Sequence, residues 1–175
     1  MINTFPVSLQ SALALALLTF ASPAAAEYNI VNVASGLVVD VVGAHTNDLQ
    51  AVILFPSNNQ KNQLFNEASG AGDGVEFYAL HSYKCLDVIE ASMNNGAPVI
   101  QYTCIDGHPN QSWTKHRMGS GVILKAVHSG KCLDAGNADF PRPPRSDARL
   151  QQWTCIASPN DPNAVNQIFK LGAWP

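Results

Sequence analysis

The chain contains two segments that are near copies of each other and a more divergent third copy. Residues 80–88 have the sequence LHSYKCLDV, residues 127–135 have VHSGKCLDA, and residues 34–41 have ASGLVVDV. The aspartates of these segments, Asp40, Asp87 and Asp134, follow one another at equal intervals of 47 residues. Self-similarity at a fixed period indicates that one structural unit is used three times.

Each unit also ends in the same way, with Asn-Gln, one further residue and an aromatic residue. We place the repeats at about 27–70, 71–119 and 120–175, and the third is the longest, with extra residues in 137–145 and 158–162. We expect the closing aromatic side chains to point inward and to meet near a pseudo-threefold axis. They are Phe65, Trp113 and Phe169.

Residues 1–26 are predicted to be a secretory signal peptide, cleaved after Ala26. They contain no Lys, Arg, Asp or Glu, and an apolar run leads to the small-residue triplet Ala24-Ala25-Ala26. A membrane anchor is the alternative, but the run is shorter than the roughly 20 residues that span a bilayer. The remaining 149 of 175 residues suffice for one domain, 27–175, with a net charge of −3. Nucleic acid is not an expected partner, because no basic run interleaved with aromatic residues occurs.

The four cysteines permit three pairings, and secretion would place them in an oxidising compartment. Cys85 and Cys132 occupy the same place in their repeats, while Cys104 and Cys155 each follow an aromatic-Thr pair. Position within the repeat therefore predicts the disulfides Cys85–Cys104 and Cys132–Cys155. The first repeat has Val38 and Ser57 at these places, so packing alone must hold it together.

The mature chain lacks sustained helical spacing of apolar residues, whereas short alternating or β-branched runs are frequent. Examples are residues 28–33, 38–42, 75–80 and 122–127. Turn residues separate these runs every few positions. We predict an all-β domain with about four strands per repeat, which closes into a barrel without exposed edges.

The combination of Cys-Leu-Asp-Val, a polar loop, Gln-x-aromatic-x-Cys and a closing Asn-Gln-x-Trp/Phe resembles the ricin-type β-trefoil lectin family. The resemblance covers essentially residues 27–175. It implies a β-trefoil of three four-stranded repeats and a shallow site in each repeat for galactose-type sugars. In such a site an aspartate accepts sugar hydroxyls, an aromatic ring stacks on the sugar's apolar face, and Gln and Asn complete the polar rim.

The resemblance implies the most complete site in the third repeat. Its residues would be Asp134, Gln151, Trp153, Asn166 and Gln167. The other repeats have Ile100 and Ile53 in place of the first glutamine, which makes their sites weaker. These weaker sites would use Asp87, Tyr102, Asn110 and Gln111 in the second repeat, and Asp40, Phe55, Asn62 and Gln63 in the first.

The residue types suit a sugar independently of the resemblance. A pyranose has one face of C–H groups, which an aromatic ring can cover, and a rim of hydroxyls that need oriented acceptors and donors. The alternatives are that the aspartates only cap turns, that Gln63, Gln111 and Gln167 are structural, and that Trp153 is a core residue. His81 and His128 recur with the repeat, each four positions before a cysteine, but a metal site is not expected there.

We therefore expect a secreted lectin that binds galactose- or N-acetylgalactosamine-type glycans and has no cofactor, no bound metal and no catalytic residues. The matched carboxylates lie one per repeat, and glycoside hydrolysis needs two close together. The alternative function is a β-trefoil protein-interaction module such as a protease inhibitor, supported by the Pro-rich segment 140–145. Protease binding that survives loss of the aspartates and ends when this loop is cut would favour the alternative.

Overall fold

Twelve strands, four from each repeat, form the part of the chain that this computed structural model describes, namely residues 27–136, 142–162 and 164–172. The predicted signal peptide lies outside these residues. The first repeat contains β1 (Asn29–Asn32), β2 (Val38–Val41), β3 (Gln50–Phe55) and β4 (Phe65–Ser69). The second contains β5 (Val75–Ala79), β6 (Cys85–Val88), β7 (Val99–Tyr102) and β8 (Ser112–Met118). The third contains β9 (Gly121–Ala126), β10 (Cys132–Ala135), β11 (Leu150–Trp153) and β12 (Phe169–Gly172).

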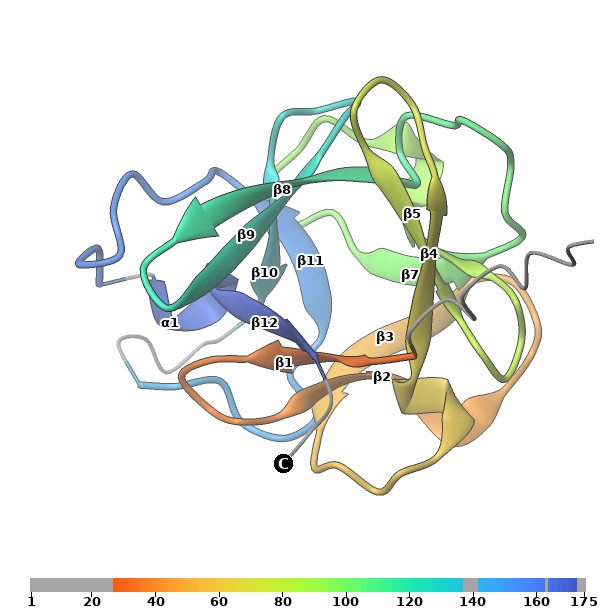
Figure 1. Ribbon diagram of the computed structural model, residues 1–175, viewed down its shortest axis with the longest axis horizontal. Coiled ribbons are helices and arrows are strands. Elements are labelled where there is room, and N and C mark those ends of the chain that lie inside the picture. The colour runs from red at the N-terminus through yellow and green to blue at the C-terminus, as the bar shows by residue number, and fades with distance from the viewer. Residues whose placement is uncertain (1–26, 137–141, 163, 173–175) are drawn as a thin grey trace, which may run out of the picture.

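The first and last strands of the repeats form a closed barrel. β1 pairs with β12, β12 with β9, β9 with β8, β8 with β5 and β5 with β4, and a bridge between Tyr28 and Phe65 returns from β4 to the start of β1. Figure 1 shows β1–β12, β4–β5 and β8–β9 as three pairs around the middle of the view. The ring has no open edge, as the sequence predicted.

The second and third strands of each repeat form a hairpin that we call a cap hairpin. The cap hairpins are β2–β3, β6–β7 and β10–β11, all antiparallel. They meet one another through β3–β7 pairing and through bridges from Ile53 to Arg149 and from Pro98 to Gln151. The all-β prediction and the four-strand repeat are therefore confirmed.

Short helical turns occur where the sequence predicted loops or, at Val42, the end of a strand. Among the described residues, the 3-10 turns are Val42–Ala44, Lys61–Gln63 and Ile89–Ala91, and one α-helical turn occurs, α1, Ala164–Gln167. The segments 61–63 and 164–167 contain the Asn-Gln pairs of the first and third repeats. One turn is too short to produce an amphipathic pattern, so the hydrophobic spacing of the sequence gave no sign of it.

The predicted inward aromatic residues occupy the centre of the core. Phe65, Trp113 and Phe169 are almost completely buried and belong to one apolar cluster. The Trp113 indole N–H donates to the Leu86 carbonyl at 3.2 Å, which satisfies the only polar group of this side chain. Three equivalent side chains from three repeats thus lie in one buried core, and the predicted inward orientation is confirmed.

The two predicted disulfides are present. Cys85 is bonded to Cys104 and Cys132 to Cys155, and each joins the start of a cap hairpin to the loop that follows it. In the first repeat Val38 takes the place of the first cysteine and is completely buried, so apolar packing replaces the covalent link there.

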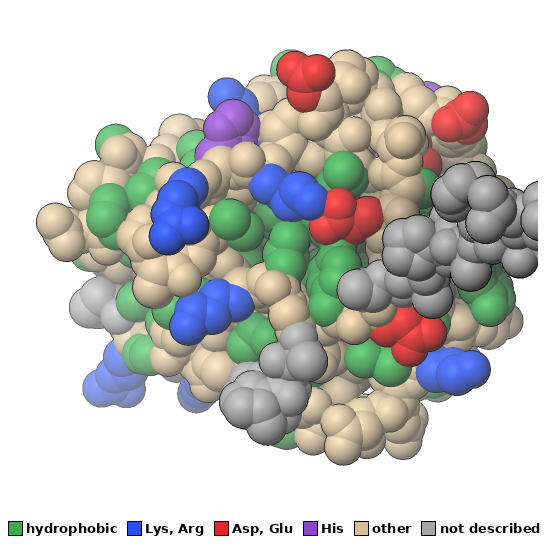
Figure 2. Space-filling view, viewed as in Figure 1, with side chains coloured by type: hydrophobic (Ala, Val, Ile, Leu, Met, Phe, Trp, Pro, Cys, Tyr) green, Lys and Arg blue, Asp and Glu red, His purple; other side chains and the backbone are tan. Residues whose placement is uncertain are grey.

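Charged side chains of both signs lie on the face drawn in Figure 2. Lys and Arg are mainly on the half around β8, β9 and β12, and Asp and Glu are on the half around β4 and β5. Within the described ranges, none of the helices is both long enough and apolar enough to cross a membrane.

Candidate functional site

Each cap hairpin places one buried aspartate and one aromatic ring on the same face. Asp40, Asp87 and Asp134 lie on β2, β6 and β10, and they are only 4%, 5% and 3% exposed. Each pairs across the hairpin with a residue two positions before the aromatic ring, and residues two apart in a strand share a face. The pairs are Asp40–Ile53, Asp87–Ile100 and Asp134–Gln151, and the rings are Phe55, Tyr102 and Trp153.

A buried glutamine holds each aspartate. In the second repeat, Gln111 Nε2 donates to Asp87 Oδ2 at 2.8 Å and to the Thr103 carbonyl at 3.0 Å, while its Oε1 accepts the Ile105 N–H at 2.8 Å. Gln63 and Gln167 make the equivalent three bonds in their repeats. Both amide hydrogens are used, and these side chains have almost no exposed surface. They therefore position the carboxylate, which is the structural role that the sequence left open.

The asparagines of the Asn-Gln pairs add a second donor in two repeats. Asn62 Nδ2 lies 3.0 Å from both Asp40 Oδ2 and the Val41 carbonyl oxygen. Asn110 Nδ2 lies 3.1 Å from both Asp87 Oδ1 and the Val88 carbonyl oxygen. These amides link the carboxylate to the backbone that leaves its strand, so the carboxylate orientation is fixed before any ligand arrives.

The third repeat obtains its second donor from the neighbouring strand instead. Gln151 Nε2 donates to Asp134 Oδ1 at 2.9 Å, and Gln167 Nε2 donates to Oδ2 at 3.0 Å. Asn166 is also buried beside this arrangement. Gln151 and Gln167 therefore both contact the Asp134 carboxylate, the residue with which the sequence analysis grouped them in one site. The remaining part of this site's loop, residues 137–141, lies outside the described residues.

Burial raises the pKa of Asp40, Asp87 and Asp134 above the ordinary value of 3.8, because desolvation penalises the charged form. The hydrogen bonds from the amide side chains act in the opposite direction. A ligand hydroxyl that donates to such a carboxylate adds a further bond to the charged form. Charge-assisted bonds of this kind are about twice as strong as neutral ones.

The aromatic rings of the cap hairpins remain accessible. Trp153 is 45% exposed, and Tyr102 and Phe55 are partly exposed. Trp153 is therefore a surface residue, in contrast to Trp113 in the core. Its ring shares a face with Asp134 and Gln151, which is the arrangement that a sugar with one apolar face requires.

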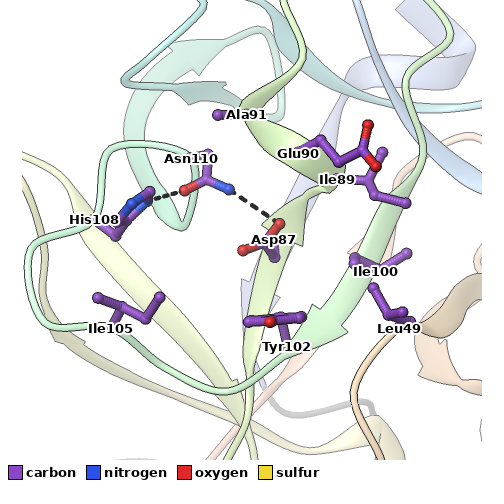
Figure 3. Close-up of a pocket in the computed structure, with 10 residues that line it drawn as sticks. All are labelled: Leu49, Asp87, Ile89, Glu90, Ala91, Ile100, Tyr102, Ile105, His108 and Asn110. Atoms are coloured by element: carbon purple, nitrogen blue, oxygen red, sulfur yellow. Dashed lines mark hydrogen bonds between the residues drawn. The ribbon is translucent and has the colours of Figure 1, made fainter.

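A pocket of about 370 Å³ opens beside Asp87 in the second repeat. Figure 3 shows the Asp87 carboxylate between the Asn110 amide and the Tyr102 ring. On the Asn110 side, a ring nitrogen of His108 donates to Asn110 Oδ1. The opposite wall includes the apolar side chains of Ile100 and, from the first repeat, Leu49, and the acid Glu90 lies on the same side, as the same view shows. The pocket therefore combines the buried carboxylate of Asp87, the exposed carboxylate of Glu90, one aromatic ring and several apolar side chains.

A pocket of about 350 Å³ occupies the corresponding place beside Asp40 in the first repeat. Phe55 and Ile53 contribute its apolar part, and Asn62 lies at its polar side. Asp147, a residue of the third repeat, also lines it. The two weaker sites of the sequence analysis thus coincide with two described pockets.

Gln101 and Gln152 are the structural residues of this region that sequence reasoning missed. The Gln101 amide donates to the carbonyls of His45 and Asn47, at 2.9 Å and 2.8 Å, and Gln152 donates to those of Ser92 and Asn94, at 2.6 Å and 2.9 Å. Each therefore fixes the pocket loop of the preceding repeat. The signal was present as a glutamine directly before the aromatic residue in both repeats, Gln101-Tyr102 and Gln152-Trp153, but a contact between repeats cannot be located from spacing alone.

His81 and His128 act in the same way. His81 Nε2 lies 3.1 Å from the His45 carbonyl oxygen and His128 Nε2 lies 3.0 Å from that of Ser92. They hold the same two loops as Gln101 and Gln152. Among the described residues, no group of three or more His, Cys, Asp or Glu is placed to hold a metal ion.

A known protein family matches this sequence. The sequence profile of the family described as ricin-type β-trefoil lectin domain-like matches residues 18–102. The chain belongs to this family. No curated protein matches the chain significantly.

Solved structures share the fold. ThreeFoil, a designed threefold-symmetric protein, is 33% identical, with a TM-score of 0.73, 85% of this chain covered and 99% of that chain. The agglutinin of Rhizoctonia solani is 17% identical, with a TM-score of 0.71, and the alignment covers 97% of this chain and all of that one (100%). The ricin B-like lectin of Macrolepiota procera, solved in complex with lactose, is 18% identical, with a TM-score of 0.66 and coverages of 86% and 96%.

One similar structure is an enzyme. The exo-β-1,3-galactanase 1,3Gal43A of Clostridium thermocellum is 25% identical, with a TM-score of 0.75 over 87% of this chain. The present chain covers only 31% of that enzyme. Proteins with this fold therefore include agglutinins and lectins as well as parts of larger glycan-degrading enzymes.

Proposed function

We propose that this chain is a secreted lectin that binds galactose- or N-acetylgalactosamine-type glycans through shallow sites, of which the third-repeat site is the best formed. The observation that supports it most is the pairing, in every cap hairpin, of a buried carboxylate held by amide donors with an accessible aromatic ring on the same face. This pair matches the two surfaces of a pyranose, its hydroxyl rim and its C–H face.

The third-repeat site is favoured by its residues. Trp153 offers the largest ring of the three and is the most accessible, and Asp134 has both oxygens oriented by glutamine side chains. The lactose complex of the Macrolepiota procera lectin and the GalNAc complex of an earthworm R-type lectin support a galactose-type ligand. Two disulfides support an extracellular location, since such bonds persist in oxidising compartments.

We expect weak affinity at each site. Two or three hydrogen bonds and one ring contact in a wet, shallow pocket give a dissociation constant of about 1 mM, or about −4 kcal/mol. Several pockets on one molecule would raise the avidity for a multivalent glycan surface without any new contact.

We further propose that the protein binds glycans without cleaving them. The buried aspartates lie one per cap hairpin, each committed to amide donors within its own repeat. Each described pocket has a second acid, Glu90 beside Asp87 or Asp147 beside Asp40. This second acid is exposed, so neither pocket contains a pair of buried carboxylates. Incubation with chromogenic galactosides should release no chromophore.

A glycan array followed by isothermal titration calorimetry with lactose tests the proposal. A Trp153→Ala variant should fold normally because the indole is exposed, and it should lose most of the signal of the third-repeat site. A double variant, Asp134→Ala with Trp153→Ala, should abolish that site, whereas Lys170→Ala, an exposed residue of β12, serves as the control. Any remaining signal that disappears on Asp87→Ala or Asp40→Ala belongs to the other repeats. No signal for the wild type, or an unchanged signal in the double variant, would refute the third-repeat site.

A further inference from the structure

Three residues with a left-handed backbone occupy the same place in the three repeats, immediately or shortly before the third strand. They are Leu49 with φ 65°, Gly96 with φ 80° and Asp147 with φ 67°. A leucine in this conformation is unfavourable, and its side chain is 62% exposed, so core packing does not explain it. The surroundings of this exposed side chain are therefore the relevant property of the position.

Each of these residues lies against the pocket of the next repeat. Leu49, from the first repeat, lines the pocket beside Asp87, and Figure 3 shows it near Tyr102 and Ile100. Asp147, from the third repeat, lines the pocket beside Asp40. A Cβ at Gly96, from the second repeat, would lie 3.7 Å from Trp153 Cζ3. The two described pockets and the Trp153 ring of the third repeat are thus each approached by a residue of the preceding repeat. That residue carries an apolar side chain in Leu49, an acidic one in Asp147 and none in Gly96.

The first-repeat pocket has an excess of hydrogen-bond acceptors. Both amide donors to Asp40 end on Oδ2, so Oδ1 receives no hydrogen bond from the described residues. Asn62 is 4% exposed, and its Oδ1 accepts no hydrogen bond. In the second repeat the corresponding oxygen of Asn110 accepts from His108, whereas position 60 in the first repeat is a glutamine that makes no such bond.

The charge of this pocket is negative without compensation from its walls. Its described lining contains Asp40 and Asp147 but neither lysine nor arginine. Burial is the main cause of the raised pKa of Asp40. The hydrogen bonds from Gln63 and Asn62 and the charge of His81 lower this pKa, and the negative charge of Asp147 raises it by a smaller amount. A cation held between the two carboxylates would relieve both effects that raise this pKa, and Phe55 offers a ring face to the C–H groups of the same ligand.

As a deepening of the proposed lectin function, on which it rests, we propose that the residue before the third strand determines the specificity of the next repeat's pocket. Asp147 makes the first-repeat pocket a site for amino sugars that carry a free ammonium group. N-acetylation removes the positive charge, so the acetylated sugar loses this advantage. In the second-repeat pocket Leu49 takes the place of Asp147, so this position adds no charge there, and the second acid of that lining is Glu90.

The test is a titration of ¹⁵N-labelled mature protein at pH 6.5 with galactose, galactosamine and N-acetylgalactosamine. The amide signal of Gly43 reports the first-repeat pocket and that of Glu90 the second, because these residues line the two pockets. At the first-repeat pocket we expect galactosamine to bind about tenfold more tightly than galactose, from one ion pair and one charge-assisted bond. This preference should decrease as salt is added, whereas galactose binding should not change.

Matched variants at the two equivalent positions separate charge from fold. Asp147→Asn keeps a side chain that tolerates positive φ and removes the charge, so the amine preference should fall to about twofold while galactose affinity is retained. Leu49→Asp should increase the preference for galactosamine over galactose at the second-repeat pocket, read from the Glu90 amide signal, and Leu49→Asn, the neutral control, should not.

Equal affinity for galactosamine and galactose at Gly43, or a preference that persists in Asp147→Asn, would overturn the inference and leave the lectin function intact. If none of the three sugars shifts the Gly43 or Glu90 amide signal or the indole N–H signal of Trp153 at the third-repeat site, the proposed function itself fails.

Discussion

Replacement of Gln111 by leucine tests whether the buried glutamine is what holds the pocket aspartate in place. The side chain is fully buried and makes three hydrogen bonds, to the Asp87 carboxylate, the Thr103 carbonyl and the Ile105 N–H. Leucine has a similar volume, so a cavity is not the main effect. What changes is that two acceptors and one donor lose their partner inside the protein.

The magnitude follows from these three bonds. A hydrogen bond to a charged group contributes about 1.5–3 kcal/mol, and each neutral one contributes about 1 kcal/mol, with a further cost for any group left without a partner. Burial of a more apolar side chain offsets part of this loss. We therefore expect Gln111→Leu to lower the free energy of unfolding by about 3–4 kcal/mol, and to lower the melting temperature by roughly 10 °C in a domain of this size.

Urea unfolding of the wild type and the variant, followed by tryptophan fluorescence, measures the difference. Gln60→Leu is the matched control, because Gln60 is exposed and its side chain has no described hydrogen bond, so its effect should stay within about 0.5 kcal/mol. A loss below about 1 kcal/mol for Gln111→Leu would refute the argument that this amide network stabilises the repeat.

Three further predictions concern the disulfides, pH and glycosylation. A Cys132→Ala and Cys155→Ala double variant should lose about 3 kcal/mol of stability in urea unfolding, since the bond closes a loop of 23 residues; a loss below about 1 kcal/mol would contradict the estimate. Lactose affinity at the third-repeat site should fall as the pH is lowered through a pKa above 3.8, because burial raises the pKa of Asp134 and its protonated form is a poorer acceptor for sugar hydroxyls; constant affinity from pH 7 to 4 would contradict this. Intact mass of protein secreted from eukaryotic cells should show no N-glycan on the sequon at Asn110, because its Nδ2 is buried and bonded to Asp87 and the Val88 carbonyl; a glycan at this residue would show that the bonds do not form.

Much of the fold could be predicted because the repeat constrains it. Cys85 and Cys132 share one repeat position, and their partners share another, which selected the correct disulfides among three pairings. Phe65 and its two counterparts follow the same Asn-Gln pair, and all lie in the core. These properties depend on contacts within a repeat or on symmetry between repeats, and both are visible as spacing in the sequence.

Contacts between unlike positions of neighbouring repeats could not be predicted. Leu49 and Asp147 line pockets whose aspartates belong to other repeats, and nothing in their local sequence indicates this. Gln101 donates to the His45 carbonyl of the neighbouring repeat, and this contact was missed because residue spacing within a repeat does not show how two repeats pack together. The resemblance to lectins placed Gln111 on the sugar rim, but its burial makes it a positioning residue for Asp87, because both amide hydrogens are already used.

The central claim, that the exposed ring and the buried carboxylate of a cap hairpin bind a sugar together, is tested most directly by the indole N–H signals during a lactose titration. Trp153 is accessible, whereas Trp113 is buried and its N–H is bonded to the Leu86 carbonyl, so one protein contains both probe and control. A Trp153→Phe variant assigns the signal. The account predicts that the Trp153 indole signal shifts saturably at millimolar lactose while that of Trp113 stays in place. A Trp153 signal that does not move at saturating lactose would contradict it.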